Sequence, residues 1–355
     1  MQSNNTLITA IEGLPPLLRA SVKAEETAYM ETIQSQGLLP FGVTPYFASL
    51  AGPDQDDPIR RQFFPDPREK QDDPFALTDP LGEALYRKAP RLVHQYRDRV
   101  LVLAGGSCAG YCRYCFRRHW ITRPQGFISE TDLSPILAYL KGHSEIREAL
   151  ISGGDPLTAL DGRLARLFKK LRDSRPGILL RLCTRAPITD PHRITPDLIR
   201  ILQVYRPLRM AVHINHPREL TPAAGDALAA CVHSGIPVHV QTVLLKGVNN
   251  DAETLGSLFR ECLDLGLSPY YLFQLDLASG TAHFRVPLKQ GLDIYRELKA
   301  RISGLGLPMY AADLPGGGGK ITLHDGVIAG IRDDPKGRFY LLQGPGGRLW
   351  PYPAD

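Results

Sequence analysis

Three cysteines lie close together in one loop of the chain, with the spacing C-x3-C-x2-C. They are Cys108, Cys112 and Cys115, and they follow directly after the apolar run of residues 99–106. A structural zinc ion takes four protein ligands, whereas iron–sulfur clusters are held by cysteine thiolates. A compact loop with three cysteines therefore suits a 4Fe-4S cluster whose fourth iron stays open for a substrate. The alternatives are a zinc loop completed by a distant ligand such as His119, and three unconnected cysteines.

A glycine-rich acidic turn follows the next apolar run. Its residues are Ser152, Gly153, Gly154 and Asp155. Glycines allow the backbone to approach a ligand closely, and a carboxylate can pair with an ammonium group. Taken alone, SGGD is a common turn. After a loop with this cysteine spacing, it resembles the motif that contacts the amino group of S-adenosylmethionine in the radical S-adenosylmethionine superfamily.

A single lysine ends a glycine run near the C-terminus. Residues 313–320 read DLPGGGGK. A phosphate-binding P-loop would need glycine at position 314 and serine or threonine at position 321, where this chain has Leu314 and Ile321. A flexible glycine run does let Lys320 reach into a pocket, which suits Schiff-base chemistry with an aldehyde cofactor. The alternative is an exposed glycine turn that ends in an ordinary surface lysine.

Taken together, the motifs resemble those of one family. CAGYCRYCFRRHW, SGGDPL, HINHPREL, QTVLLKGVNND, PYYLFQLDLASGTAHFRVP and DLPGGGGK occur in the same order as in the lysine 2,3-aminomutases, over residues 85–325. The resemblance implies an isomerase that uses a 4Fe-4S cluster, S-adenosylmethionine and pyridoxal 5'-phosphate. It implies interconversion of L-lysine and β-lysine, through a 5'-deoxyadenosyl radical and a shift of the amino group between neighbouring carbons while the substrate is held by pyridoxal phosphate.

The resemblance also implies how pyridoxal phosphate is bound. Lys320 matches the lysine that forms the Schiff base with the cofactor. Tyr96 and Arg99, in HQYRDRV, match residues near the cofactor phosphate. Gln95 stands where the family usually has a basic residue, so we expect a weaker phosphate anchor here.

Two polar residues in predicted strands match the family's nucleoside-binding motifs. They are His213, in HINHPREL, and Gln241, in QTVLLKGVNND. The resemblance implies that both contact S-adenosylmethionine. A buried histidine at the end of a strand could equally have a structural role, so this alternative stays open for His213.

Three charged residues match the positions that select the substrate. Asp276 and Asp313 match two aspartates that hold the ε-ammonium group of lysine, and Arg117 matches an arginine that binds the substrate carboxylate in a bidentate way that lysine could not copy. A second ammonium group needs acceptor carboxylates, because an unpaired buried cation costs several kcal/mol. Relatives acting on glutamate would need a donor or a cation instead. The alternative for Arg117 is a surface position in the basic cluster with Arg118 and His119.

Alternating strand and helix patterns must position these residues. We expect strands at residues 99–105, 147–152, 178–184, 208–214, 237–245 and 269–275, with a last extended piece at 307–312. We expect helices at residues 130–141, 159–173, 195–204, 221–234, 252–266 and 288–304. Such alternation predicts a parallel sheet of βα units, closed or partly closed as a barrel, with its chemistry at the carboxyl ends of the strands. The resemblance implies a partial (β/α)6 TIM-type radical S-adenosylmethionine barrel.

We expect three parts along the chain. Residues 1–90 form an N-terminal helical extension, in which the Pro- and Asp-rich stretch 52–80 wraps around the protein and is too polar for a packed core. Residues 91–312 form the barrel. Residues 313–355 form a C-terminal segment that carries the pyridoxal phosphate lysine.

Composition narrows the class of protein. The chain has 355 residues, of which 43% are hydrophobic and 22% charged, as in ordinary globular proteins. Its start is not a signal peptide, and no apolar run reaches the roughly 18 residues of a membrane span, so we expect a cytoplasmic protein without membrane contact. Cys183, Cys231 and Cys262 are scattered and do not indicate a disulfide framework. The net charge of +5 suits small anionic ligands as well as nucleic acid.

The expected partners are lysine and an electron donor such as flavodoxin or ferredoxin, without nucleic acid. A homo-oligomer is left open. A branch of the same family makes β-lysine for attachment to elongation factor P, and the intact PGGGGK of residues 315–320 favours a metabolic enzyme without deciding the question. A further candidate is a radical S-adenosylmethionine enzyme that acts on another amino acid, or on RNA or protein without pyridoxal phosphate. A non-catalytic iron–sulfur or zinc protein would give no reason for SGGD or the glycine run.

Overall fold

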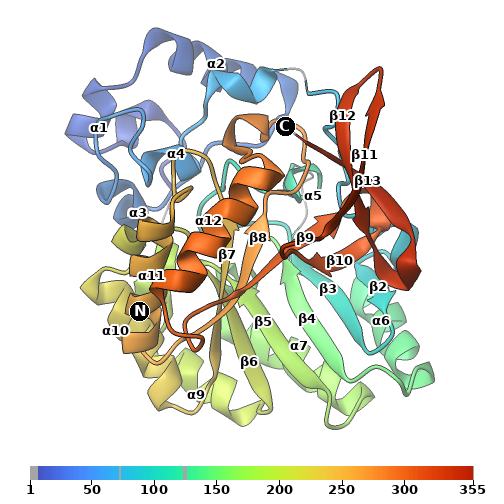
Figure 1. The fold of residues 1–355 in the computed structure, drawn as a ribbon. Coiled ribbons are helices and arrows are strands. Elements are labelled where there is room, and N and C mark those ends of the chain that lie inside the picture. The colour runs from blue at the N-terminus through green and yellow to red at the C-terminus, as the bar shows by residue number, and fades with distance from the viewer. Residues whose placement is uncertain (1–6, 72, 123–125, 355) are drawn as a thin grey trace.

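A ten-stranded sheet forms the body of the protein, and its strands follow one another in chain order (Figure 1). The structure, a computed structural model, describes residues 7–71, 73–122 and 126–354. The first six residues of the predicted extension therefore lie outside the described residues. The strands are β1 Arg87–Ala89, β2 Leu92–Tyr96, β3 Arg99–Gly105, β4 Glu148–Gly153, β5 Leu179–Thr184, β6 Leu208–His213, β7 Val238–Leu244, β8 Ser268–Gln274, β9 Met309–Leu314 and β10 Gly319–Thr322.

The sheet is a partial barrel. Strands β3 to β9 pair in parallel, whereas β1, β2 and β10 add antiparallel edges. Among the described residues β1 and β10 are the two edges of the sheet, so the barrel does not close. The predicted fold class is confirmed, including the last extended piece, which is β9.

One long helix follows each of the strands β3 to β8, as the sequence pattern predicts. These helices are α6 Glu130–Gly142, α7 Asp161–Ser174, α9 Pro196–Val204, α10 Pro222–His233, α11 Ala252–Asp264 and α12 Leu288–Arg301. Ser129, Thr195, Thr221 and Asp251 begin four of them, and each side chain accepts a hydrogen bond from the backbone N–H three residues later. The bounds of the six predicted strands and of the six predicted helices agree with the structure to within a few residues. No helix of the described residues is long and apolar enough to cross a lipid bilayer.

The N-terminal extension consists of short helices packed against the barrel. They are α1 Pro16–Ala20, α2 Ala24–Gln36, α3 Pro45–Ser49 and α4 Arg60–Phe63, with the 3-10 turns η2 Pro67–Lys70 and η3 Glu83–Tyr86. The prediction that residues 52–80 are too polar for a packed core is wrong around α4. Ile59, Phe63 and Phe64 are buried in the main hydrophobic core, and the polar residues 60–62 of the same turn are buried as well. Charged residues and prolines on both sides make this apolar group difficult to recognise in the sequence.

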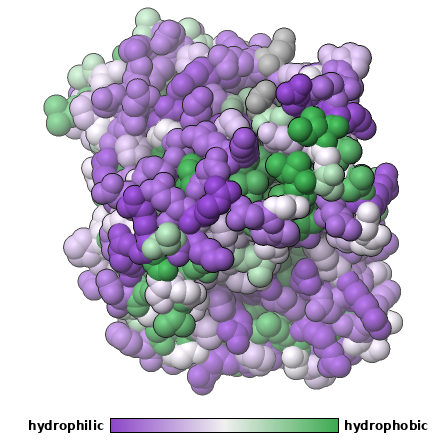
Figure 2. All heavy atoms as spheres, in the orientation of Figure 1, coloured by the Kyte–Doolittle hydropathy of each residue, from purple (hydrophilic) through white to green (hydrophobic). Residues whose placement is uncertain are grey.

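The C-terminal segment begins as a hairpin and continues into a second sheet. The glycine run forms a tight turn between β9 and β10, and the register places Lys320 directly opposite Asp313. The sequence predicts that a flexible glycine run carries Lys320. The structure instead places Lys320 on strand β10, directly after the turn. The following antiparallel sheet, β11 Ile328–Asp334, β12 Gly337–Gln343 and β13 Leu349–Pro353, was not predicted. Figure 2 shows a mainly hydrophilic face on which apolar side chains gather near this sheet. Ile331 on β11 and Leu349 on β13 are exposed apolar residues of the sheet.

Candidate active site

The carboxyl ends of the parallel strands bring the predicted site residues to one edge of the barrel. The cysteine loop follows β3, Ser152 lies near the end of β4, and His213 ends β6. Gln241 on β7 is the direct pairing partner of His213. Asp313 lies near the end of β9. Because parallel strands end on the same side of a barrel, residues predicted for different cofactors share one face.

The three cysteines of the loop are free and partly buried. Burial and the negative charges of Asp155 and the neighbouring cysteines raise the pKa of Cys108 well above its ordinary value. Burial and Cys112 raise the pKa of Cys115 to about 11. Neighbouring thiols with raised pKa values become thiolates only when a bound cation compensates their charge, which is what a metal cluster does.

The spacing of these three thiols suits a 4Fe-4S cluster. Within the part of the chain that the structure describes, no three His, Cys, Asp or Glu side chains converge as they would around one ion. In a 4Fe-4S cluster each cysteine binds a different iron, so the sulfurs stay further apart.

The SGGD turn packs against the start of the cysteine loop. A Cβ atom on Gly153 would lie 2.4 Å from the Gly105 oxygen, and one on Gly154 would lie 2.3 Å from the Ser107 oxygen. The backbone N–H of Asp155 donates to the Ser107 oxygen at 2.7 Å. These two glycines are required for this close approach of protein to protein.

The carboxylate of Asp155 is already fully engaged by the protein. It accepts hydrogen bonds from the Thr184 hydroxyl at 2.7 Å and from the backbone N–H groups of Leu157, Arg185 and Ala186 at 2.9, 2.8 and 3.0 Å. Its side chain therefore fixes the end of β5 relative to β4.

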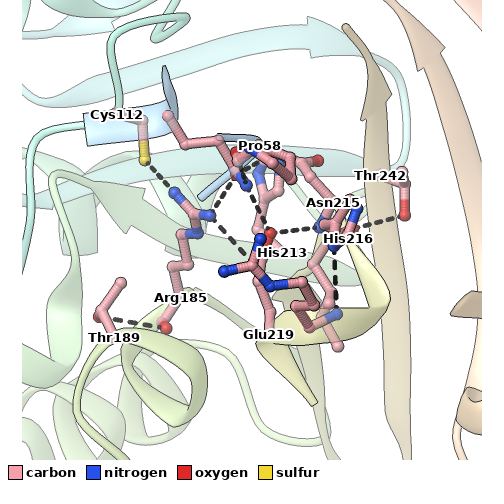
Figure 3. A network of polar contacts seen from close by, with 12 residues as sticks. Pro58, Cys112, Arg185, Thr189, His213, Asn215, His216, Glu219 and Thr242 are labelled. Atoms are coloured by element: carbon pink, nitrogen blue, oxygen red, sulfur yellow. Dashed lines mark hydrogen bonds and ion pairs between the residues drawn. The ribbon is translucent and has the colours of Figure 1, made fainter. Parts of the chain in front are cut away.

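A buried polar network links the cysteine loop to the strand ends and to the N-terminal extension (Figure 3). Arg185 donates to the Cys112 sulfur at 2.9 Å, to the Gln62 side-chain oxygen at 2.6 Å and to Glu219 at 3.1 Å. Asn215 donates to the same Gln62 oxygen at 3.0 Å. One amide of helix α4 thus holds two residues from the carboxyl ends of β5 and β6.

His213 belongs to this network and is neutral. Its Nε2 lies 3.1 Å from the Asn215 side-chain oxygen, and burial together with the charge of Arg185 lowers the pKa of His213 to about 3. A neutral imidazole at a strand end can offer one donor and one acceptor to a ligand. The contact with Asn215 agrees equally with a structural role for this histidine.

Lys320 lies in an aromatic and acidic setting. Its Nζ is 2.5 Å from Asp313 Oδ2 and 4.0 Å from the centre of the Phe273 ring. Its backbone N–H donates to the Tyr96 hydroxyl at 3.0 Å, and the Arg99 guanidinium lies 4.0 Å from the centre of the Tyr96 ring. A partly buried lysine with an aromatic wall and nearby cationic and hydroxyl groups fits a phosphorylated aromatic aldehyde such as pyridoxal phosphate.

Gln95 does not replace the missing basic anchor. Its side-chain N–H donates to the Gly317 oxygen of the glycine turn at 3.4 Å. This residue therefore holds the turn that precedes Lys320. The prediction of a weaker phosphate anchor stays a prediction.

Asp276 and Asp313 form an acidic pair beside Lys320. Burial and the charge of Asp313 raise the pKa of Asp276 to about 8, although Lys320 and Arg117 pull it down. Two carboxylates in a poorly hydrated space repel each other, which adds to the effect of burial on Asp276. The structure brings all of the predicted substrate residues within electrostatic reach of one another.

Arg117 is held by an acid that the sequence did not single out. Its Nε and Nη2 donate to Glu83 at 3.0 and 2.7 Å, and its Nη1 donates to the Ser152 hydroxyl at 3.1 Å. Both side chains are largely buried, which excludes the surface alternative for Arg117.

The sequence analysis assigned no role to five residues of the site: Gln62, Glu83, Arg185, Asn215 and Glu219. Arg185 and Asn215 come directly or almost directly after β5 and β6, so the rule that strand ends carry chemistry could have found them. Gln62 and Glu83 lie in the extension, where no local pattern marks them. Only their position in the folded chain shows their partners.

Comparison with known proteins finds relatives across most of the chain. The Radical SAM superfamily matches residues 102–258. A Treponema pallidum protein with the provisional name L-lysine 2,3-aminomutase is 48% identical over 265 residues, 75% of either chain. The L-lysine 2,3-aminomutase of Bacillus subtilis is 38% identical over 322 residues, 90% of this chain and 68% of that protein. The glutamate 2,3-aminomutase of Clostridioides difficile is 33% identical over 317 residues, 89% of this chain and 74% of that protein.

Proposed function

This chain belongs to the lysine 2,3-aminomutase family of radical S-adenosylmethionine isomerases, and we propose that it interconverts L-lysine and β-lysine. Enzymes of this family use a 4Fe-4S cluster, S-adenosylmethionine and pyridoxal 5'-phosphate. When bound, these groups supply the radical hydrogen transfer and the carrier for the migrating amino group. The protein supplies binding, orientation and electrostatics.

The proposed roles of the protein residues follow their positions in the site. The cysteine loop holds the cluster and Lys320 carries pyridoxal phosphate, with Tyr96 and Arg99 beside it. The residues proposed to line S-adenosylmethionine are Ser152, Gly153, Gly154, Asp155, His213 and Gln241. Because the two groups of residues share one edge of the barrel, the sites proposed for S-adenosylmethionine and pyridoxal phosphate lie at the same end of the barrel.

The acidic pair is the observation that supports lysine as the substrate. Burial, and after it the charge of Asp313, raise the pKa of Asp276 to about 8, and an ammonium group placed beside the two aspartates would favour the ionised form of Asp276. The side-chain carboxylate of glutamate would add a further negative charge there. Arg117 lies close enough to lower the pKa of Asp276, and its planar guanidinium suits the carboxylate common to all amino acids.

The test is an anaerobic reconstitution with iron, sulfide, S-adenosylmethionine, pyridoxal phosphate and a reductant. L-lysine, L-glutamate and L-alanine are offered separately, and the products are identified by NMR. We expect β-lysine from lysine and no isomer of the other two. Isomerisation of glutamate or alanine as fast as lysine would leave only the broader aminomutase activity. Reduced flavodoxin and ferredoxin can be compared as electron donors in the same assay.

The cluster ligands can be tested in the same preparations. A variant with Cys108, Cys112 and Cys115 replaced by Ala should lose the iron and sulfide that the wild type binds. The matched control is Cys183→Ala, which removes a thiol outside the loop and should retain about four irons per chain. If the triple variant also keeps that iron, the assignment of the ligands is wrong.

A further inference from the structure

One segment of the extension touches the predicted binding positions of both substrate and cofactor. We call residues 73–86 the strap. Leu77 pairs with the chain just after Asp276: its N–H donates to the Leu277 oxygen at 2.8 Å, and its oxygen accepts from Ser279 at 3.2 Å. The strap is therefore bound to the strand end that carries one of the two substrate aspartates.

Further along the chain, the strap also forms hydrogen bonds with the glycine turn before Lys320. The Pro80 oxygen accepts from the Gly316 N–H at 2.9 Å, and the Tyr86 hydroxyl donates to the Gly317 oxygen at 2.8 Å. Gly82 has a φ of +62°, and a Cβ atom there would lie 2.7 Å from the Gly317 nitrogen. Backbone lies directly on backbone at this point, which fixes the strap relative to the lysine-bearing hairpin.

Glu83 follows this close contact and binds Arg117. The Asp79 side chain accepts from the Glu83 backbone N–H at 3.0 Å, so the turn that carries Glu83 is capped. A guanidinium has five N–H groups. The bonds to Glu83 and to the Ser152 hydroxyl use three of them. Two N–H groups are left for a carboxylate of the substrate.

We propose that Glu83 is a positioning residue, which orients Arg117 to receive the α-carboxylate of the amino acid and aligns it, through the strap, with Asp276 and Lys320. The inference rests on the proposed function, because it assumes an amino acid substrate at Arg117. A carboxylate that merely competed with the substrate would need to move away on binding. Glu83 is largely buried and its backbone lies in a segment bonded at Leu77, Pro80 and Tyr86, so it is not placed to leave.

The test compares two ligands in Glu83→Gln, which keeps the shape of the side chain and removes its charge and one strong acceptor. Dissociation constants of L-lysine and of 1,5-diaminopentane, which is lysine without its carboxylate, are measured from the absorbance of bound pyridoxal phosphate in the unreduced enzyme. We expect lysine to bind about 10-fold or more weakly, since hydrogen bonds to charged groups are worth about 1.5–3 kcal/mol. Binding of 1,5-diaminopentane should stay within about twofold.

The control is Glu31→Gln, an exposed acid on α2 that should change neither constant. Equal weakening of both ligands in Glu83→Gln would mean that Glu83 only supports the fold, and tighter lysine binding would mean that it competes with the substrate. Either result, or no change, overturns the proposal. If the wild type isomerises another amino acid, that amino acid and its decarboxylated amine replace the pair. Failure of the lysine assignment is thereby separated from failure of this inference.

Discussion

Asp276 is a buried acid of the candidate site whose pKa is raised, so its charge should influence how tightly a cation binds beside it. Burial comes first among the causes that raise its pKa to about 8, followed by the charge of Asp313, while Lys320 and Arg117 act in the opposite direction and Glu83 adds to the rise. Below that pH the ligand-free pocket holds a neutral Asp276. Above it Asp276 is ionised, and an added ammonium group beside it offsets that charge.

Lysine should therefore bind more tightly as the pH rises. The dissociation constant of L-lysine should fall between about pH 7 and about pH 9, because Asp276 ionises while the lysine ε-ammonium, with a pKa of about 10.4, stays charged. In Asp276→Asn this part of the pH dependence should disappear. In the same variant kcat/KM for lysine should fall roughly 10- to 150-fold, because one charge-assisted hydrogen bond is lost. Titration of both proteins at several pH values checks this, with equal pyridoxal phosphate content as the control. If the dissociation constant of lysine changed with pH in the same way in both proteins, the role assigned to Asp276 would be refuted.

Lys320 should be the residue that carries pyridoxal phosphate. Its side chain lies against Phe273 with Asp313 at its Nζ, whereas Lys246 and Lys289 are exposed. Reduction of the holoenzyme with borohydride, followed by digestion and mass spectrometry, should place the phosphopyridoxyl group on the peptide that contains Lys320. The group should be missing from Lys320→Ala. Its discovery on Lys246 or Lys289 would contradict the assignment.

Close packing between β4 and the cysteine loop gives a prediction at the scale of elements. In Gly154→Ala the new Cβ would lie 2.3 Å from the Ser107 oxygen, so the backbone just before Cys108 must shift. We expect a loss of about 1–3 kcal/mol of stability from overpacking and a lower iron content after reconstitution. Gly162→Ala on α7 is the matched control, because its Cβ meets nothing within 4 Å. Equal iron content in the two variants would show that the loop tolerates the shift.

The repeating elements of the barrel could be predicted from the sequence because each carries its own signal. Apolar runs mark the strands from β3 to β8, and residues such as Thr195 and Asp251 mark where the helices between them begin. Once the strands are placed, the carboxyl-end rule brings His213 and Asp276 to one edge. The cysteines and Lys320 stand out by spacing alone.

The parts of the fold and of the candidate site that the sequence does not predict depend on contacts between segments that are distant in the chain. Glu83 and Gln62 are ordinary polar residues until the extension folds over the barrel, and their partners Arg117 and Arg185 lie 34 and 123 positions away. Among the described residues the strands β11 to β13 pair with one another and with no strand of the barrel. Their residues alternate too weakly for the sequence to separate them from turns. Burial of Phe63 likewise follows from what covers it and not from its neighbours in sequence.

At the scale of the whole molecule, the extension and the cysteine loop are joined by a buried ion pair. Glu69 in η2 accepts hydrogen bonds from Arg113 Nε at 2.8 Å and Nη2 at 2.7 Å, and also pairs with Arg118. Arg113 stands directly after Cys112 and is fully buried. Despite the opposing effect of burial, Arg113 and Arg118 lower the pKa of Glu69 below its ordinary value. The stability that this pair contributes is therefore present at neutral pH and is lost as the pH falls through the lowered pKa.

Breaking this pair should loosen the extension and the cluster loop together. Glu69→Gln leaves Arg113 buried without its counter-charge, which typically costs about 3–5 kcal/mol, so we expect a clearly lower urea midpoint at neutral pH and faster loss of iron to a chelator. In acid the difference from the wild type should shrink, because wild-type Glu69 also becomes protonated. Asp173→Asn is the matched control: it breaks the exposed pair with Lys169, 2.6 Å long, and should leave the midpoint and iron release unchanged. If Glu69→Gln unfolded earlier but released iron at the wild-type rate, the extension would stabilise the fold without holding the cysteine loop.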